Sequence, residues 1–141
     1  MKIQIKSKID AKVLFECKAD SVKMAVEIAI KANANLRYAD LSNADLRYAD
    51  LSYADLSHAV LRYADLHYAD LRYADLRSAD IDFSCWPLWC GSKKIKVDIK
   101  IVYQLMAHVC VLDCDDKIFK KARKFLLPFA KKFHKWDEFN G

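Results

Sequence analysis

Residues 34–83 read ANLRY ADLSN ADLRY ADLSY ADLSH AVLRY ADLHY ADLRY ADLRS ADIDF, which is one five-residue unit repeated ten times. Alanine holds the first position of every copy, and leucine holds the third position except at Ile81. An α-helix would turn each Leu by about 140° from the one before and leave no apolar stripe. A flat strand would send successive leucines to opposite faces, because the period is odd. The pattern therefore predicts a solenoid, in which the chain bends at every repeat and all Ala and Leu side chains share one interior.

The unit Ala-(Asp/Asn)-Leu-x-x resembles the motif of the pentapeptide-repeat family, over about a third of the chain. The resemblance implies a right-handed quadrilateral β-helix with four repeats per coil, so that ten repeats make about 2.5 coils. At a strand spacing of about 4.8 Å the stack would be only about 12 Å tall. The tail, with CWPLWCGS at residues 85–92, is similar to that of small bacterial and phage members of the family. The predicted fold class is an all-β solenoid core with α-helical appendages.

The flanks of the repeats predict two caps, because the ends of a solenoid expose apolar cross-sections and unpaired strand edges. We expect an N-terminal β-β-α cap at residues 1–33, the β-helix at residues 34–83, and an aromatic plug with a two-helix cap at residues 84–141. In the first cap, strands are expected at residues 2–6 and 12–17 from their alternating or β-branched residues. A helix should follow Asp20-Ser21, a good N-cap.

The C-terminal segment predicts a helical hairpin. Asp98 is a candidate N-cap for one helix, and a second should run from about Lys117 to Lys135 and bend at Pro128. Four aromatic residues, which we call the end-cap aromatics, provide more apolar surface than so small a cap readily buries: Trp86, Trp89, Phe133 and Trp136. This surplus favours a homo-oligomer formed through an end of the β-helix or through the C-terminal helices.

Charge and composition narrow the class of protein. The net charge of +5 divides into +3 for residues 1–31, −4 for residues 32–83 and +6 for residues 84–141. No stretch reaches the ~20 apolar residues of a membrane span, and the N-terminus has no apolar segment typical of a secretory signal. Five cysteines, an odd number, are then expected to be reduced thiols, so the predicted location is cytoplasmic.

The outward positions predict a candidate contact surface on the β-helix. With four repeats per coil, residues twenty apart stack, which places Tyr48 under Tyr68 and Tyr53 under Tyr73, with Arg72 beside them. Tyr and Arg are enriched at protein interfaces, so these five residues are protein-contact candidates. The alternative is that the tyrosines only form ladders that stabilise the sheet.

The acidic second positions also stack, and one column is interrupted. Val60 lies between Asp40 and Asp80, where an apolar residue either marks a contact or only relieves repulsion between carboxylates. We therefore add Val60 to the contact candidates.

The final predicted helix is basic and amphipathic. At about 100° per residue its apolar residues, Ile118 and Phe125 among them, fall on one arc of about 140°, and only Leu127 lies outside that arc. Its basic face includes Lys117, Lys120, Lys121, Lys124, Lys131 and Lys132. Such a helix can lie on an anionic membrane surface or bind nucleic acid or a partner protein. The alternative is that its apolar face packs on the preceding helix or on a second copy of the chain, with the lysines in solvent.

The sequence predicts no metal, no cofactor and no catalysis. The spacings Cys85-x4-Cys90 and Cys110-x3-Cys114 lack the Cys-x2-Cys pattern of zinc sites. No nucleophile elbow, phosphate-binding loop or paired acid and base is recognisable, and two glycines leave little loop chemistry. The protein is therefore expected not to be an enzyme.

The predicted function is a non-catalytic protein-protein interaction or scaffold module with an unknown protein partner. The alternative is binding of nucleic acid or an anionic surface through the basic C-terminal helix. Some pentapeptide-repeat proteins imitate B-DNA and bind type II topoisomerases, which is a third candidate. A short rod of net −4 with interleaved Arg and basic ends disfavours that role.

Overall fold

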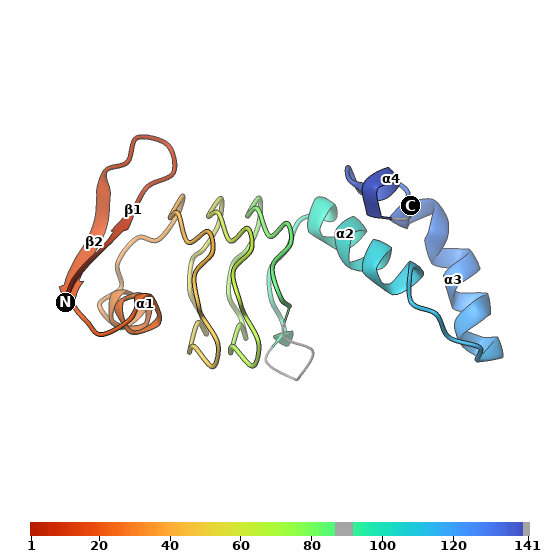
Figure 1. Cartoon of the computed structure of the whole chain (residues 1–141), viewed down its shortest axis with the longest axis horizontal. Helices are drawn as coiled ribbons and strands as arrows, with labels where there is room; N and C mark the ends of the chain where they lie inside the picture. The colour runs from red at the N-terminus through yellow and green to blue at the C-terminus, as the bar shows by residue number, and fades with distance from the viewer. Residues whose placement is uncertain (87–91, 140–141) are drawn as a thin grey trace. The chain divides into compact units, whose positions relative to one another are not determined.

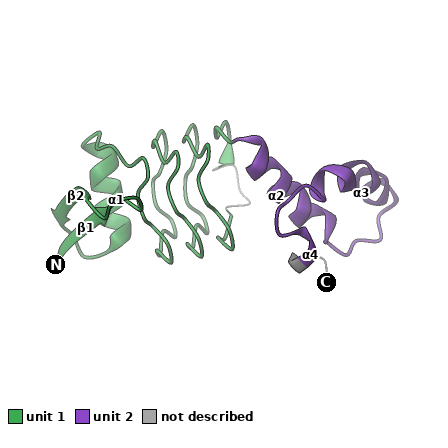
Figure 2. Ribbon diagram, turned by 90° about the horizontal axis from the view of Figure 1, so that it is seen from above, with its two compact units in different colours: residues 1–97 green, residues 98–141 purple. Residues whose placement is uncertain are grey.

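The computed structural model describes residues 1–86 and 92–139. Its elements are β1 (Lys2–Lys6), β2 (Val13–Lys18), α1 (Val22–Lys31), α2 (Ile99–Cys110), α3 (Lys117–Ala130) and α4 (Trp136–Phe139). They form two compact units, Met1–Val97 and Asp98–Gly141, with the repeats in the first (Figures 1 and 2). None of the described helices is long and apolar enough to cross a membrane.

Each repeat bends through the same backbone bond, and every copy except that of Val60 adds an Asx turn. In the third copy, the Ala49 N–H donates to the Leu46 carbonyl at 3.1 Å, and Tyr48 between them has a φ of 59°. The Asp45 carboxylate accepts a bond from the Arg47 N–H at 3.2 Å, an Asx turn. Every fifth-position residue has a positive φ, which is uncommon without glycine: Tyr38, Asn43, Tyr48, Tyr53, His58, Tyr63, Tyr68, Tyr73, Ser78 and Phe83. The corners of the coil are therefore built from Asx turns and left-handed residues.

Successive coils pair at a separation of twenty residues, as the sequence predicts. Asp45 pairs with Asp65, for example, through bonds from the Leu46 N–H to the Asp65 carbonyl and from the Asp65 N–H to the Ala44 carbonyl, both 2.9 Å. The nine leucines at the third position are at most 2 % exposed. Burying each one stabilises the coil by about 1.5–3 kcal/mol before entropy is counted. The expected apolar interior of the β-helix is confirmed.

Pairing continues past the expected boundary at residue 83. Cys85 pairs with Asp65, and Lys96 pairs with Asp75, 21 residues earlier. The compact unit accordingly runs to Val97. Of the expected aromatic plug, Trp86 is half-buried, while Trp89 and Cys90 lie outside the described residues.

The β1–β2 hairpin and α1 cover the first coil, in agreement with the predicted β-β-α segment (Figure 1). The Asp40 N–H donates to the Lys6 carbonyl at 2.8 Å, which extends the hairpin onto the coil. From α1, the Glu27 carboxylate accepts the Asp50 N–H at 2.9 Å. Ser21 caps α1 by accepting the Met24 N–H. Backbone donors at this edge of the solenoid are thus bonded by the cap.

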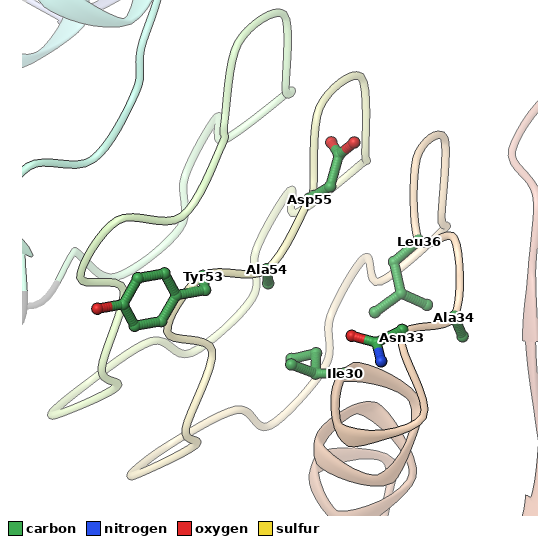
Figure 3. A pocket seen from close by; sticks show the side chains of 7 residues that line it. All are labelled: Ile30, Asn33, Ala34, Leu36, Tyr53, Ala54 and Asp55. Atoms are coloured by element: carbon green, nitrogen blue, oxygen red, sulfur yellow. The ribbon is translucent and has the colours of Figure 1, made fainter.

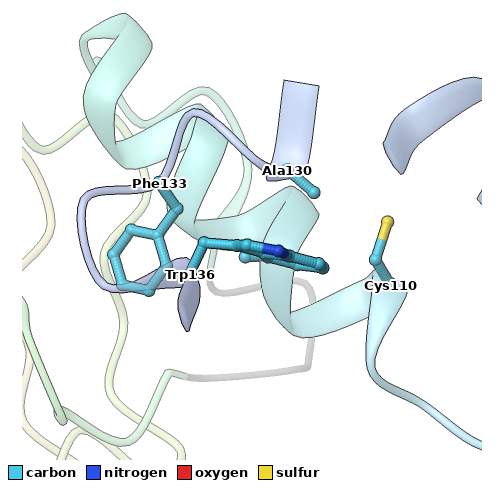
Figure 4. Close-up of a cluster of buried hydrophobic side chains, with 5 residues drawn as sticks. Cys110, Ala130, Phe133 and Trp136 are labelled. Carbon is cyan, nitrogen blue, oxygen red and sulfur yellow. The ribbon is translucent and has the colours of Figure 1, made fainter. Parts of the chain in front are cut away.

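The C-terminal unit has its own core, formed where α2 and α3 pack together. The buried residues of this core are Ala107, Cys110, Ala130, Phe133 and Trp136. Figure 4 shows the ring of Trp136 in the middle of this group. The expectation that the last two residues leave surplus aromatic surface is wrong, since Phe133 is 6 % and Trp136 is 9 % exposed. These two residues therefore give no support to self-association, which stays a prediction.

The second expected helix is shorter than predicted, and a further short helix follows it. Asp98 and Asp116 cap α2 and α3, and α3 ends at Ala130 instead of Lys135. Pro128 lies in its last turn, where it supplies no N–H donor to the preceding turn. A short irregular segment then leads to α4.

Candidate protein-binding surfaces

Two aromatic ladders stand on the outside of the β-helix where the sequence predicts them. The rings of Tyr48 and Tyr68 are 5.1 Å apart between centroids, and those of Tyr53 and Tyr73 are 4.8 Å apart, each pair within 5° of parallel. Tyr53 is 74 % exposed and Tyr73 is 39 % exposed. The rings therefore stack on each other while they remain open to solvent.

Two further ladders were missed by the sequence analysis. Tyr38 stacks on His58 at 4.7 Å, and Tyr63 stacks on Phe83 at 5.0 Å. Ladders consequently occupy all four columns of the coil instead of two adjacent faces. The same twenty-residue spacing would have identified them, had mixed aromatic pairs been considered together with Tyr–Tyr pairs.

One ladder borders a small pocket beside α1. The pocket measures about 180 Å³ and is lined by Ile30, Asn33, Ala34, Leu36, Tyr53, Ala54 and Asp55. Figure 3 shows the end of α1 on one side of it and the Tyr53–Asp55 segment on the other. Small-molecule sites usually measure about 300–1,000 Å³, so this volume suits a single side chain better than a cofactor.

Arginine side chains neutralise much of the acidic surface around the ladders. Arg72 binds Asp70 through its Nε at 2.9 Å, and this bond holds the pKa of the Asp70 carboxyl below its ordinary value. Arg47 lowers the pKa of Asp45 to about 2 by the same kind of bond. The Arg72 side chain is half exposed and lies next to Tyr73 in the chain, so it remains accessible at the ladder.

Val60 interrupts an acidic column in the manner predicted. It pairs with Asp40 on one side and Asp80 on the other and is half-buried. It does not line the pocket beside Tyr53. The structure thus places Val60 apart from the pocket, and its contact role stays a prediction.

The basic face of α3 is exposed, as are several of its apolar residues. All six predicted lysines are exposed, but Lys131 and Lys132 lie beyond the end of α3, so only four of them are on the helix. Leu126 and Leu127 pack against the unit's core, although Leu127 lies outside the apolar arc that the sequence predicts. Ile118 and Phe125 lie within that arc, yet they are 78 % and 72 % exposed. Packing on α2 therefore covers only part of the apolar face.

One group of mixed metal-ligand types lies on the β-helix. Asp65, His67 and Cys85 offer ligand atoms that are all within 4.8 Å of one another. Cysteine and histidine spacings along the chain do not predict this group; the twenty-residue register, which pairs Cys85 with Asp65, would have identified it.

Comparison with known families gives one match. The family described as pentapeptide repeats (8 copies) matches residues 32–62 and 54–85. No curated protein matches the chain at a significant level.

Proposed function

Because residues 32–85 belong to the pentapeptide-repeat family, we propose that this protein is a non-catalytic binding module built on a right-handed quadrilateral β-helix. Its contact surface is the Tyr53–Tyr73 ladder together with Arg72 and the neighbouring pocket. The partner is a protein that inserts one side chain into that pocket.

The observation that carries the proposal is a stacked, exposed tyrosine that lines a pocket of side-chain size. Tyr53 is 74 % exposed, stacks on Tyr73 and lines the pocket. A tyrosine that is already ordered loses little conformational entropy on binding and presents a large amphipathic surface. Tyr and Arg are also the residue types that most often dominate binding energy at interfaces.

The lining of the pocket favours a lysine or arginine of the partner. Ile30 and Leu36 provide apolar walls, and Asp55 and Asn33 provide oxygen acceptors. Long basic side chains bury an aliphatic stem and keep a charged head that such acceptors can bind. The Asp55 carboxylate is about half exposed. Its Oδ1 accepts bonds from the Ser57 N–H and hydroxyl, and its Oδ2 lies 3.8 Å from Arg37, so an incoming cation would compete with Arg37 for Oδ2.

The test is recovery of partners by the full-length tagged protein from lysate of its native host, with and without nuclease. We expect Tyr53→Asn to abolish recovery of a stoichiometric protein, while the matched Tyr48→Asn change on another column leaves it intact. Asn is suitable because Asn43 occupies the same repeat position at a φ of 57°. Equal recovery by both variants and the parent would show that the ladder only stabilises the coil.

A second candidate function rests on α3. Ile118 and Phe125 are exposed on a helix whose charged residues are all basic, a combination typical of helices that bind anionic surfaces. Replacing Lys120, Lys121 and Lys124 by Gln should then abolish binding to anionic vesicles or to nucleic acid. Binding of this kind weakens steeply between low and moderate salt, whereas a packed protein interface is much less sensitive.

A further inference from the structure

We propose that Asp65, His67 and Cys85 bind a divalent transition-metal ion of the zinc type. A carboxylate oxygen, an imidazole nitrogen and a thiol sulfur from these residues lie within 4.8 Å of one another. The Asp65 Oδ1 and His67 Nδ1 atoms are 2.6 Å apart. The site is independent of the Tyr53 pocket and adds a ligand class that the proposed function does not require.

The register of the coils brings the three residues together. Asp65 and Cys85 are directly paired, with a bond of 3.0 Å from the Cys85 N–H to the Ala64 carbonyl and one of 3.2 Å from the Leu66 N–H to the Cys85 carbonyl. His67 follows Asp65 by two residues, and its N–H donates to the Asp65 carboxylate at 3.0 Å. The backbone therefore fixes all three positions before any ligand arrives.

Two departures from the repeat meet at this point. The column that holds Asp45 and Asp65 has a cysteine, Cys85, at its next level. At the fourth position of the repeat, His67 is the one histidine among arginines, serines and an aspartate. In three other repeats the arginine at that position binds the aspartate of its own repeat: Arg47, Arg72 and Arg77. At residues 65–67 an imidazole, which can ligate a cation, takes the place of the arginine of the same repeat, so the nearest guanidinium is that of Arg47 on the preceding coil.

The donor set indicates which metal fits. Thiolate and imidazole ligands suit Zn²⁺ and related transition metals, whereas Ca²⁺ and Mg²⁺ prefer oxygen ligands alone. Zinc bonds of about 2.0–2.3 Å at tetrahedral angles place ligand atoms about 3.3–3.7 Å apart. The Asp65 Oδ1 and His67 Nδ1 atoms, now 2.6 Å apart, must therefore separate slightly, which the exposed His67 side chain can do by rotation. Three protein ligands leave the fourth tetrahedral position to water.

The Asp65 carboxylate divides its two oxygens between neighbours. Its Oδ1 faces His67, and its Oδ2 is 3.7 Å from the Arg47 Nε. Arg47 reduces the local negative charge, so we expect a site of moderate affinity. A bound ion would link Cys85 to the coil below it, and would thus stabilise the end of the regular repeats against opening.

The experiment is titration of the full-length reduced protein with Zn²⁺, followed by calorimetry, and with Co²⁺, followed by absorption. We expect one ion per chain and a thiolate-to-cobalt charge-transfer band. Cys85→Val and His67→Arg should each weaken binding at least tenfold. Both variants introduce a residue that the repeat already carries at that position, Val60 and Arg72, so the fold should be kept, and circular dichroism checks this.

Cys114→Ser, which removes an exposed thiol of the other unit, is the matched control and should bind like the parent. The proposal is overturned if Cys85→Val binds Zn²⁺ with the parent's stoichiometry and affinity, or if the cobalt complex shows no thiolate band. Partner recovery by Tyr53→Asn reports separately on the proposed function, so the two can fail independently.

Discussion

A double-mutant cycle at Tyr53 and Tyr73 measures what the exposed ladders contribute to stability. Each tyrosine is replaced by Asn singly and together. The ring centroids are 4.8 Å apart and nearly parallel, a geometry that contributes about 0.5–1.5 kcal/mol beyond the area it buries. We therefore expect a coupling free energy in that range between the two positions.

Other effects of these substitutions cancel in the cycle. Both residues have positive φ, 60° and 63°, which costs about 1–2 kcal/mol for most residues and less for Asn. Lys94 also lies over the Tyr73 ring at 5.4 Å. Each of these free-energy terms contributes equally to one single mutant and to the double mutant. The coupling free energy therefore contains only the stacking between the two rings. The single change Tyr53→Asn should alter the free energy of unfolding by less than about 1 kcal/mol, because Asn adopts the positive φ at a lower cost and this gain offsets the lost stacking.

Hydrogen exchange at two amides of the β-helix provides the readout. The Leu56 N–H donates to the Asp75 carbonyl at 2.9 Å, and the Asp75 N–H donates to the Ala54 carbonyl at 2.8 Å. Their slow exchange reports opening of the β-helix without interference from the C-terminal unit. A coupling within about 0.3 kcal/mol of zero would refute the view that the rings stabilise the coil. The pair Tyr48 and Tyr73, on different columns, should be additive.

Three further predictions follow from burial and charge. Leu56→Lys should unfold the β-helix, because Leu56 is 0 % exposed and an unpaired buried charge is severely destabilising; loss of its circular dichroism signal measures this. The pKa of Asp45 is lowered from 3.8 to about 2 by Arg47, so its contribution to stability is complete above pH 3.8 and should be lost as the pH falls toward 2, as acid unfolding would show. Burial raises the pKa of the Cys110 thiol, so it should react with a thiol reagent much more slowly than the exposed Cys114.

Each of these predictions has a matched control. Ile118→Lys, at a position 78 % exposed, should leave the fold intact, and equal behaviour of the two lysine variants would contradict the proposed register. Asp45→Asn should flatten the stability profile between pH 3.8 and 2, and an unchanged profile would show that the ion pair contributes nothing. Comparable labelling rates for the two thiols would disprove burial of the first.

The parts of the fold that depend on local rules were predictable from the sequence. The interior of the β-helix follows from the spacing of Ala and Leu, because every repeat meets the same geometry. The helix starts at Ser21 and Asp98 follow from capping, which involves only neighbouring residues. The Tyr48–Tyr68 contact follows from the register alone.

Other features required information that no local pattern holds. The sequence predicts the apolar arc of α3, but it does not indicate which part of that arc packs against α2. The exposure of Phe125 was therefore not predicted. The group at Asp65, His67 and Cys85 depends on pairing beyond the last regular repeat, where the Ala-Asp-Leu motif has ended. The positive φ of the tyrosines was also not foreseen, since bulky residues rarely adopt it.

The Asx turns provide a structural reason for the acidic residues of the β-helix. Asp75 accepts the Arg77 N–H within its own repeat, and Asn35 accepts the Arg37 N–H in the same way without a charge. The carboxylates are therefore explained by the bending of the chain, before any target is considered. The negative potential of such a rod is a by-product of its corners, and a resemblance to DNA that rests on that potential alone carries no information about what the protein binds.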